Sequence, residues 1–266
     1  MSDARHDLPG RVLVEIGVGA DIRPATALAA RLSRIFGSRV KGVFVEDADL
    51  LQLADLALAL EINVIGRQLQ SLDAKALPAE IRRSLAAARR EFAELARNLQ
   101  CEVELEVARR RLAQPALQVE RDDIFLFSST LGWTSASPDW TAAAQAMGIA
   151  FPAARTPPQS GSIMAVLGSD LSLQRARRLL EHIAAAEKAE LEVSVSDEPL
   201  SALLDLLGRA DRLGARPTVS PRLIVGEAEL LAHPRARTLR SSIGKASCPI
   251  LLLNPGPPEI EGQTSA

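Results

Sequence analysis

Two turns rich in glycine and hydroxyl residues contain the residue types of this 266-residue sequence that could carry chemistry. The turn GVGAD spans Gly17 to Asp21, and the stretch SSTLGWTSAS begins at Ser128. Glycine lets a backbone amide approach a phosphate closely, so such turns can cradle anions. The GVG sequence lacks the third glycine of a dinucleotide-binding fingerprint, which favours a tight strand-to-helix turn there. The hydroxyl-rich stretch is compatible with a pocket lining and with an ordinary loop.

No residues have the spacing of a catalytic or metal-binding site. The histidines, His6, His182 and His233, have no serine, cysteine or metal-ligand partner at a recognised spacing. Cys101 and Cys248 each lie beside a predicted strand and are interpreted as small buried hydrophobic residues. We therefore expect no catalytic residue, no metal ion and no enzymatic activity.

Composition restricts the partners that the chain can have. The net charge is −2, which gives no electrostatic reason to expect nucleic acid as a partner. Aromatic residues make up 3% and tyrosine is absent, so stacking platforms for bases are not expected. No apolar run approaches the ~20 residues that span a bilayer, and the start of the chain is polar. We expect a cytoplasmic protein without a membrane or nucleic-acid partner.

An internal repeat organises the sequence. Residues 11–47 read as a strand, a helix and a second strand, and residues 162–198 follow the same pattern without a gap. In this alignment Gly17 corresponds to Gly168. Strands that alternate with helices form parallel sheets flanked by helices. The sequence therefore predicts an α/β fold with two tandem units, each a mostly parallel sheet.

The second unit is predicted to be reduced, because it has no counterpart of a long helical segment and of the strand-like stretch CEVELEVA. The expected division of the chain is a disordered tail at 1–10, a first complete domain at 11–154 with a long helical segment at 48–100, a linker at 155–161, a shortened second domain at 162–254 and a disordered tail at 255–266.

The stretch from Leu50 to Ile65 is too apolar for an exposed helix. Packing within its own domain, folding over a ligand cleft and formation of a subunit interface are the alternatives for this stretch.

Three stretches together resemble the universal stress protein family in its tandem form. They are RVLVEIG with its following helix, GVFVED, and RLIVGEAEL followed by ASCPILLL. The resemblance implies universal-stress-protein-like (adenine nucleotide hydrolase-like) units, and it makes ATP or another adenine nucleotide a possible ligand. In this family a loop of pattern glycine, two residues, glycine, nine residues, glycine and serine or threonine holds the phosphates. An aspartate after the first strand and a valine in the second hold the nucleoside.

The sequence departs from this motif at most positions. In the second unit Gly226 fits the first glycine, Glu229 replaces the second, and Arg237 stands where serine or threonine is expected. A carboxylate at Glu229 would repel phosphate. The nucleotide motif is therefore interpreted as degenerate.

Ligands of open α/β sheets bind at the carboxyl ends of the strands. A surviving site is expected in the first unit, at Ile16, Gly17, Val18, Gly19, Val45, Ser128, Ser129, Thr130 and Gly132. In the second unit only a vestigial loop is expected, at Gly168, Gly226 and Arg237.

The function that these features favour is a non-catalytic stress-response or signalling binding protein of the universal stress protein type, with a degenerate nucleotide site. One alternative is a dimeric scaffold or interaction module without a small ligand. Another is ATP or AMP binding through the first domain. The expected partners are a second copy or an intramolecular pairing of the two domains, together with an unidentified protein partner.

Overall fold

The computed structural model describes residues 8–48, 52, 60–63, 68–71, 76–110, 117–128, 143–154, 161–213, 221–233 and 236–254. The first part of the chain contains β1 (Arg11–Ile16), α1 (Arg23–Phe36), β2 (Arg39–Asp47), β3 (Leu60–Asn63), β4 (Gln68–Ser71), α3 (Ala76–Asn98), β5 (Val103–Arg110), β6 (Asp123–Phe127) and β7 (Gly148–Phe151). The second part contains β8 (Ile163–Leu167), α5 (Asp170–Glu187), β9 (Leu191–Val195), α6 (Pro199–Leu213), β10 (Leu223–Glu227), the short 3-10 helix η1 (Ala228–Ala232), α7 (Ala236–Ile243) and β11 (Ile250–Leu253).

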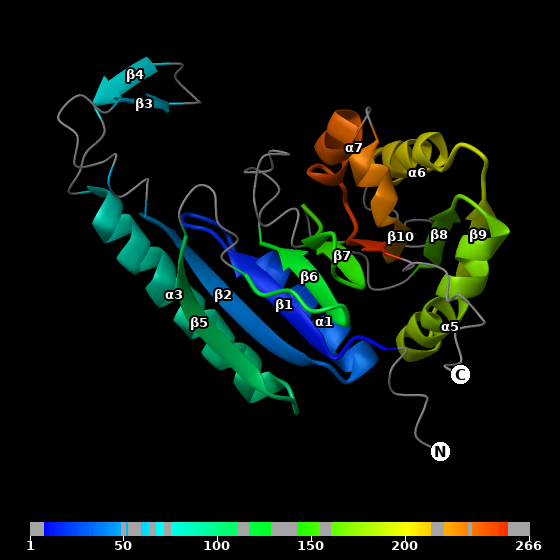
Figure 1. Ribbon diagram of the computed structural model, residues 1–266, viewed down its shortest axis with the longest axis horizontal. Helices are drawn as coiled ribbons and strands as arrows, with labels where there is room; N and C mark the ends of the chain where they lie inside the picture. Colours follow the sequence, from blue (N-terminus) through cyan, green and yellow to red (C-terminus); the bar gives the residue numbers. More distant parts are fainter. Residues whose placement is uncertain are drawn as a thin grey trace, which may run out of the picture.

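A nine-stranded sheet runs through the molecule in the order β5-β2-β1-β6-β7-β11-β10-β8-β9 (Figure 1). The neighbouring strands pair in parallel, except that β7 and β11 are antiparallel. The sheet thus consists of two parallel halves, which we call the first repeat (residues 11–154) and the second repeat (residues 162–254). The predicted α/β class with a mostly parallel sheet is confirmed. That the two halves form one continuous sheet was not evident from the sequence.

Local sequence signals explain where the elements begin and end. The strand β1 is an almost completely buried apolar run, as a central parallel strand requires. Helix α1 has Pro24 in its first turn and ends at Gly37, whose φ of 68° is a left-handed conformation that glycine adopts without strain. Helices α1 and α5 end at Phe36 and Glu187, which are equivalent positions of the repeat.

The sheet is covered on both faces, so the chain has two apolar cores. Alternate residues of β1 such as Val12 and Val14 pack in one core with residues of α1, α3 and α5. The intervening Leu13 packs in the other core with Phe125 and with residues of α6 and α7. This alternation follows from the two-residue period of a strand.

The two repeats also touch through α1 and α5. Arg31 on α1 makes a bidentate pair with Glu187 on α5, with N–O distances of 2.8 and 3.0 Å. His182 on α5 lies with its Nε2 2.7 Å from the carbonyl oxygen of Ile35, and its ring stacks on Phe36 at 5.9 Å. His182 therefore contributes to packing between the repeats.

Two predictions about the first unit need correction. Residues 60–63 and 68–71 lie within the segment 48–100 that was expected to be helical, but they pair as an antiparallel hairpin, β3–β4. Helix α3 occupies only the later part of that segment. Residues 8–10, expected in a disordered tail, pack on the first repeat, where Pro9 is buried and its carbonyl accepts a hydrogen bond from Ser38.

Other predictions lie outside the described residues or were met only in part. The described residues exclude most of the two predicted tails, at 1–7 and 255–266, and most of the predicted linker, at 155–160. They also exclude most of the apolar stretch 50–65. In the second repeat, the described part of the chain has no strand paired with the outer edge of β9, where the first repeat has β5 beside β2. The helices of the described residues include none that is long and apolar enough to cross a membrane.

Candidate functional site

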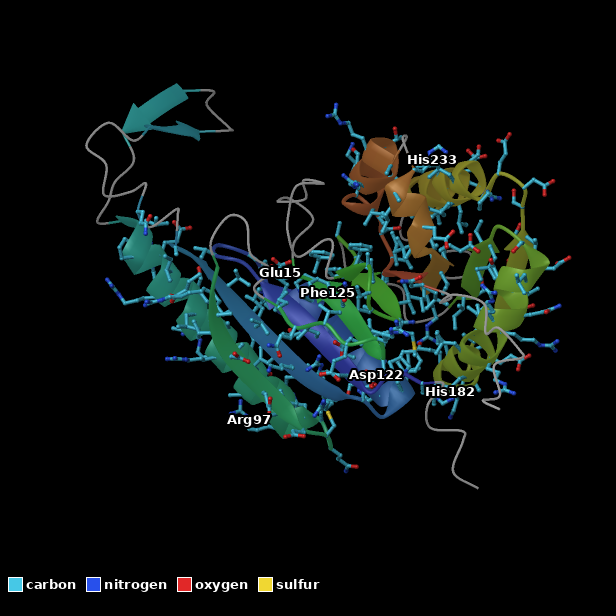
Figure 2. The ribbon with its side chains drawn as sticks, in the orientation of Figure 1. Glu15, Arg97, Asp122, Phe125, His182 and His233 are labelled. Atoms are coloured by element: carbon cyan, nitrogen blue, oxygen red, sulfur yellow. The ribbon has the colours of Figure 1, made fainter. Side chains whose placement is uncertain are left out.

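The carboxyl ends of β1, β2 and β6 meet at one edge of the first repeat. Their register places Glu15 of β1 beside Val43 of β2 and Phe127 of β6. The amide of Ser128, directly after β6, donates to the Glu15 carbonyl at 3.1 Å. Glu15 itself is half-buried near this edge (Figure 2). The predicted site residues Ile16, Gly17, Val45 and Ser128 are therefore brought to the same edge of the sheet.

Those residues do not all face one cavity. Ile16 is buried in the core beneath α1 and α3, whereas Val45 is buried in the core on the opposite face. Ser128 is buried as well. The expected role of Ile16 beside a ligand is thus replaced by a packing role. Ser129, Thr130 and Gly132 lie outside the described residues.

The glycine turn after β1 is held by helix α3. The Gly19 amide donates to the hydroxyl of Ser84 at 3.0 Å, and the φ of Gly19 is 75°. A Cβ at Gly19 would lie 3.3 Å from the Glu80 carboxylate. Gly19 is therefore needed for its backbone conformation, and its amide is already occupied by Ser84. Ser84 and Glu80 are site neighbours that the sequence did not indicate, because they come from a helix more than 60 residues away in the chain.

Charged pairs surround the same edge. The Asp21 carboxylate accepts from the Arg23 side chain at 2.9 and 2.8 Å and from the Arg23 amide at 3.3 Å. This side-chain bond to Arg23 lowers the pKa of Asp21 below its ordinary value. Asp21 does not cap helix α1, because the N-cap position is Ile22. At the ends of β2 and β5, Glu46 pairs with Arg109 at 3.2 Å.

The space that a side chain at Gly17 would fill is open among the described residues, whereas the equivalent space at Gly168 in the second repeat is occupied. A Cβ on Gly17 would meet no atom of the described residues within 4 Å. A Cβ on Gly168 would lie 2.9 Å from the Glu227 carboxylate and 3.3 Å from Pro199. The repeat register aligns Ile124 with Leu223, so Glu227 corresponds to Ser128 of the first repeat. A carboxylate thus stands where the first repeat has a hydroxyl.

The glycine of the second repeat's predicted vestigial loop lies elsewhere than expected. Gly226 is a residue of β10 and not of the loop that follows. A Cβ there would lie 3.1 Å from Leu252 and 3.3 Å from Leu203, so Gly226 allows close packing in the core. Arg237 is exposed in the first turn of α7. Glu227 is 8% exposed, and its Oε1 has no hydrogen-bond partner among the described residues. These residues offer no amide cradle for phosphate.

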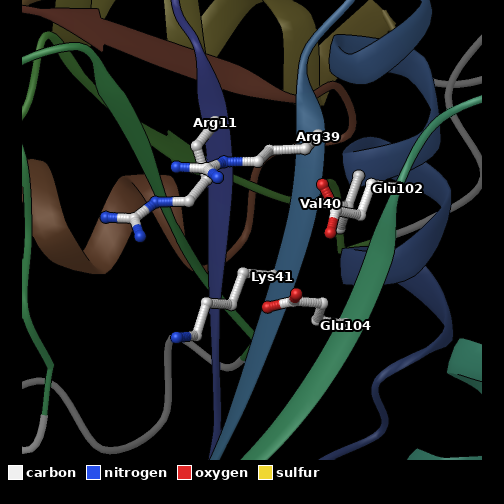
Figure 3. Close-up of a pocket in the computed structure, with 6 residues that line it drawn as sticks. All are labelled: Arg11, Arg39, Val40, Lys41, Glu102 and Glu104. Carbon is white, nitrogen blue, oxygen red and sulfur yellow. The ribbon is translucent and has the colours of Figure 1, made fainter.

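A small charged pocket opens at the opposite end of the first repeat's strands (Figure 3). It has a volume of about 90 Å³ and is lined by Arg11, Arg39, Val40, Lys41, Glu102 and Glu104. The Arg11 guanidinium is held by Asp123 at 2.7 and 2.6 Å, and this hydrogen bond raises the pKa of Arg11 above its ordinary value. Lys41 pairs with Glu106 at 2.7 Å. The three cations lie on β1 and β2 and the two carboxylates lie on β5 or directly before it, and Arg11 and Lys41 are already paired with Asp123 and Glu106.

The histidines and cysteines, whose side chains could react or bind a metal ion, do not form a common site among the described residues. His182 and His233 are on different elements and well separated (Figure 2). Cys101 and Cys248 are both free thiols. Within the described ranges, no group of histidine, cysteine, aspartate or glutamate is arranged to hold a metal ion.

Comparisons with known proteins give structural likeness without a sequence match. No protein-family model matches the sequence. No curated protein matches it either. Among solved structures, the chain is similar to a protein from Pseudomonas aeruginosa UCBPP-PA14 described as a universal stress protein, with 12% identity, a TM-score of 0.47 and coverage of 95% of each chain. It is also similar to the functionally unknown protein PA1789 from Pseudomonas aeruginosa PAO1, with 12% identity, a TM-score of 0.48 and coverage of 96% of this chain and 95% of that one.

The first of these structures carries the family description that the sequence stretches resemble. The assignment of the α/β class rests on the strand order and register described above and not on these two matches.

Proposed function

We propose that this chain is a non-catalytic binding protein of the universal stress protein type, acting in stress response or signalling, whose nucleotide site is degenerate in both repeats. The observation that carries the proposal is the arrangement around the two equivalent glycines. In the second repeat the Glu227 carboxylate lies over Gly168, at the carboxyl ends of the strands where ligands of such sheets bind. A buried carboxylate repels a phosphate group and offers it no hydrogen.

The first repeat supports a weaker form of the same proposal. Among the residues that the structure describes, none has an atom within 4 Å of a Cβ placed on Gly17. Yet the Gly19 amide is taken by Ser84, and the Glu80 carboxylate lies beside it. A small ligand that lacks phosphate groups, or that contacts this turn through an uncharged part, suits these surroundings better than a triphosphate.

Thermal unfolding with ATP, ADP and AMP tests this proposal. We expect no rise in the unfolding temperature at millimolar nucleotide. Ligand at about 100 times its dissociation constant would stabilise the fold by about 2.7 kcal/mol, which is a shift of several degrees. We also expect no release of phosphate or AMP from ATP during incubation with the protein, because the described residues of the proposed site include no paired nucleophile and base.

A clear shift with ATP would contradict the degenerate site and favour the alternative of nucleotide binding through the first repeat. Two variants would then show which repeat binds the nucleotide. G17V fills the open space after β1, so it should abolish the shift if the first repeat binds. L171A is the matched control, because Leu171 is 53% exposed at the equivalent turn of the second repeat.

A further inference from the structure

The outer edge of β9 is an unpaired strand with exposed apolar residues. β9 is the last strand of the sheet, and Val193 and Val195 are 39% and 43% exposed. The strand at the other end of the sheet, β5, carries the charged residues Glu104, Glu106, Arg109 and Arg110 along its length. Charged residues protect an edge from pairing with another chain. The sequence LEVSV of β9 contains a single charge, Glu192, and no proline.

The first repeat shows what is missing beside β9. There, β2 occupies the equivalent position, pairs with β5 and packs against α3. Phe44 of β2 is fully buried, while its equivalent, Val195, is 43% exposed. The second repeat has kept the apolar side chains of this face, but the described residues include no strand or helix that covers them as β5 and α3 cover β2.

We propose that the β9 edge pairs with the β9 edge of a second copy of this chain, in antiparallel orientation about a two-fold axis at Val193. This register places Val193 opposite Val193, and Leu191 opposite Val195 of the second copy. Glu192 lies opposite Ser194. The apolar residues of both copies then form one continuous strip on the face that carries α5, and cross-strand apolar pairs stabilise such a ladder.

The backbone of β9 is oriented for this pairing. The Glu190 carbonyl accepts from Ile163, and the Ser196 amide donates to Leu167, so the even-numbered residues are bonded inward to β8. In a strand, the backbone groups of successive residues point to opposite edges. Leu191, Val193 and Val195 therefore direct their N–H and C=O groups outward. In the proposed register these are the residues that lie opposite one another and exchange hydrogen bonds.

Charge selects this register over its neighbours. With the axis at Val193, the exposed Lys188 of each copy lies at the level of the exposed Glu198 of the other copy, just beyond the ends of β9. Moving the axis to Glu192 would set two glutamates opposite each other, which destabilises a ladder. Moving it to Ser194 would set Leu191 opposite Asp197. Of these three registers, only the one with the axis at Val193 pairs apolar residues with apolar residues and opposite charges with each other.

The proposal does not depend on whether the first repeat binds a ligand, and it is tested by the molar mass of the full chain in solution. We expect the wild type to be a dimer by light scattering coupled to size exclusion. V193K places a lysine at the two-fold axis and should raise the dimer dissociation constant by at least about tenfold, which is about 1.4 kcal/mol. L171K is the matched control: it adds a lysine at an exposed leucine of α5 that is not a residue of β9, and it should leave the dimer unchanged.

A charge exchange tests the register. E198K sets lysine against Lys188 and should weaken the dimer by about threefold, as expected for an exposed ion pair. The double variant K188E/E198K should restore the wild-type dissociation constant. Circular dichroism confirms that each variant is folded. A monomeric wild type, a dimer that V193K leaves intact, or a double variant that is as weak as E198K would each overturn the proposal.

Discussion

The two repeats share their first strand, helix and second strand but differ in what surrounds them. In the first repeat β2 is an interior strand, flanked by β5 and covered by α3. In the second repeat the same strand, β9, forms the edge of the sheet. Gly42 of β2 lies against Phe92 of α3, and the residue at its equivalent position, Val193, is exposed. The comparison shows that one local pattern can serve as core or as free surface, according to the elements that follow it.

A second difference concerns the amino ends of the strands. In the first repeat Arg11 and Asp123 form an ion pair between β1 and β6 whose side chains are 9% and 0% exposed. The equivalent residues of the second repeat are Ser162 and Arg222, and Arg222 pairs instead with Glu187 at 2.8 Å. The ion pair of the first repeat is thus internal. In the second repeat Glu187 pairs with Arg222 of its own repeat and also with Arg31 of the first repeat, so only the pair with Arg31 joins the two repeats.

The largest expected effect is at the buried ion pair. D123A leaves the Arg11 guanidinium buried without its main partner, and we expect it to lower the free energy of unfolding by about 3–5 kcal/mol. R222A is the matched change in the second repeat, and we expect a smaller loss because the Arg222 side chain is 22% exposed. Urea denaturation of both variants measures the difference. Equal losses would remove the distinction between the fully buried ion pair of the first repeat and the more exposed one of the second.

An intermediate effect is expected where a glycine of one repeat corresponds to a valine of the other. A Cβ at Gly42 would lie within 2.3 Å of the Phe92 ring, so G42V forces that ring and α3 to move. We expect G42V to lower the free energy of unfolding by about 1–3 kcal/mol. V193A removes exposed atoms at the equivalent position and should change the free energy of unfolding of the monomer by less than about 0.5 kcal/mol. Thermal or urea unfolding at low protein concentration provides both values.

Should G42V be as stable as the wild type, α3 would not be packed on β2 as described. A large loss with V193A in the monomer would instead mean that the second repeat depends on β9 side chains that the structure leaves exposed.

The smallest effect concerns the two cysteines, one in each repeat. Burial raises the pKa of the Cys248 thiol from 9.0 to about 12. Between these values only the unfolded chain ionises this thiol, so the stability that Cys248 contributes is complete below pH 9 and is lost as the pH rises toward 12. Cys101 is half-buried and lies 3.1 Å from the Ser33 hydroxyl.

We therefore expect iodoacetamide at pH 8–9 to modify Cys101 before Cys248 in the native protein, because the thiolate is the reacting species. Peptide mass spectrometry follows both sites, and the same reaction in urea serves as the control, where the two rates should converge. Faster modification of native Cys248 would show that the core of the second repeat opens readily.

Much of the fold could be predicted from local sequence. Residues 11–47 and 162–198 were each expected to form a strand, a helix and a second strand, and they form β1, α1 and β2 in the first repeat and β8, α5 and β9 in the second. These features depend on apolar runs, strand period and the conformation of glycine, which neighbouring residues determine. The hairpin at β3–β4 was missed because an apolar run alone does not distinguish a helix from strands.

The candidate site was predictable only as an edge of the sheet. The rule that ligands bind at the carboxyl ends of parallel strands pointed to Gly17 and Ser128, which directly follow β1 and β6 at one edge of the sheet. Glu227 was not predicted as a site residue, because the comparison with the family motif pointed to Glu229 instead. Ser84 and Glu80 could not be found either, because they reach the turn from a helix that is distant in sequence.

The sequence by itself determined the α/β class, the internal repeat and the shortening of the second unit, because hydrophobic period and turn residues act over short stretches of chain. Tertiary structure alone decided that β7 and β11 join the repeats in one sheet, that Glu227 lies over Gly168, and that β9 forms an edge. The reason is physical: whether an apolar strand is buried depends on contacts between residues far apart in the chain. Those contacts made Phe44 a core residue and left Val195 at the surface.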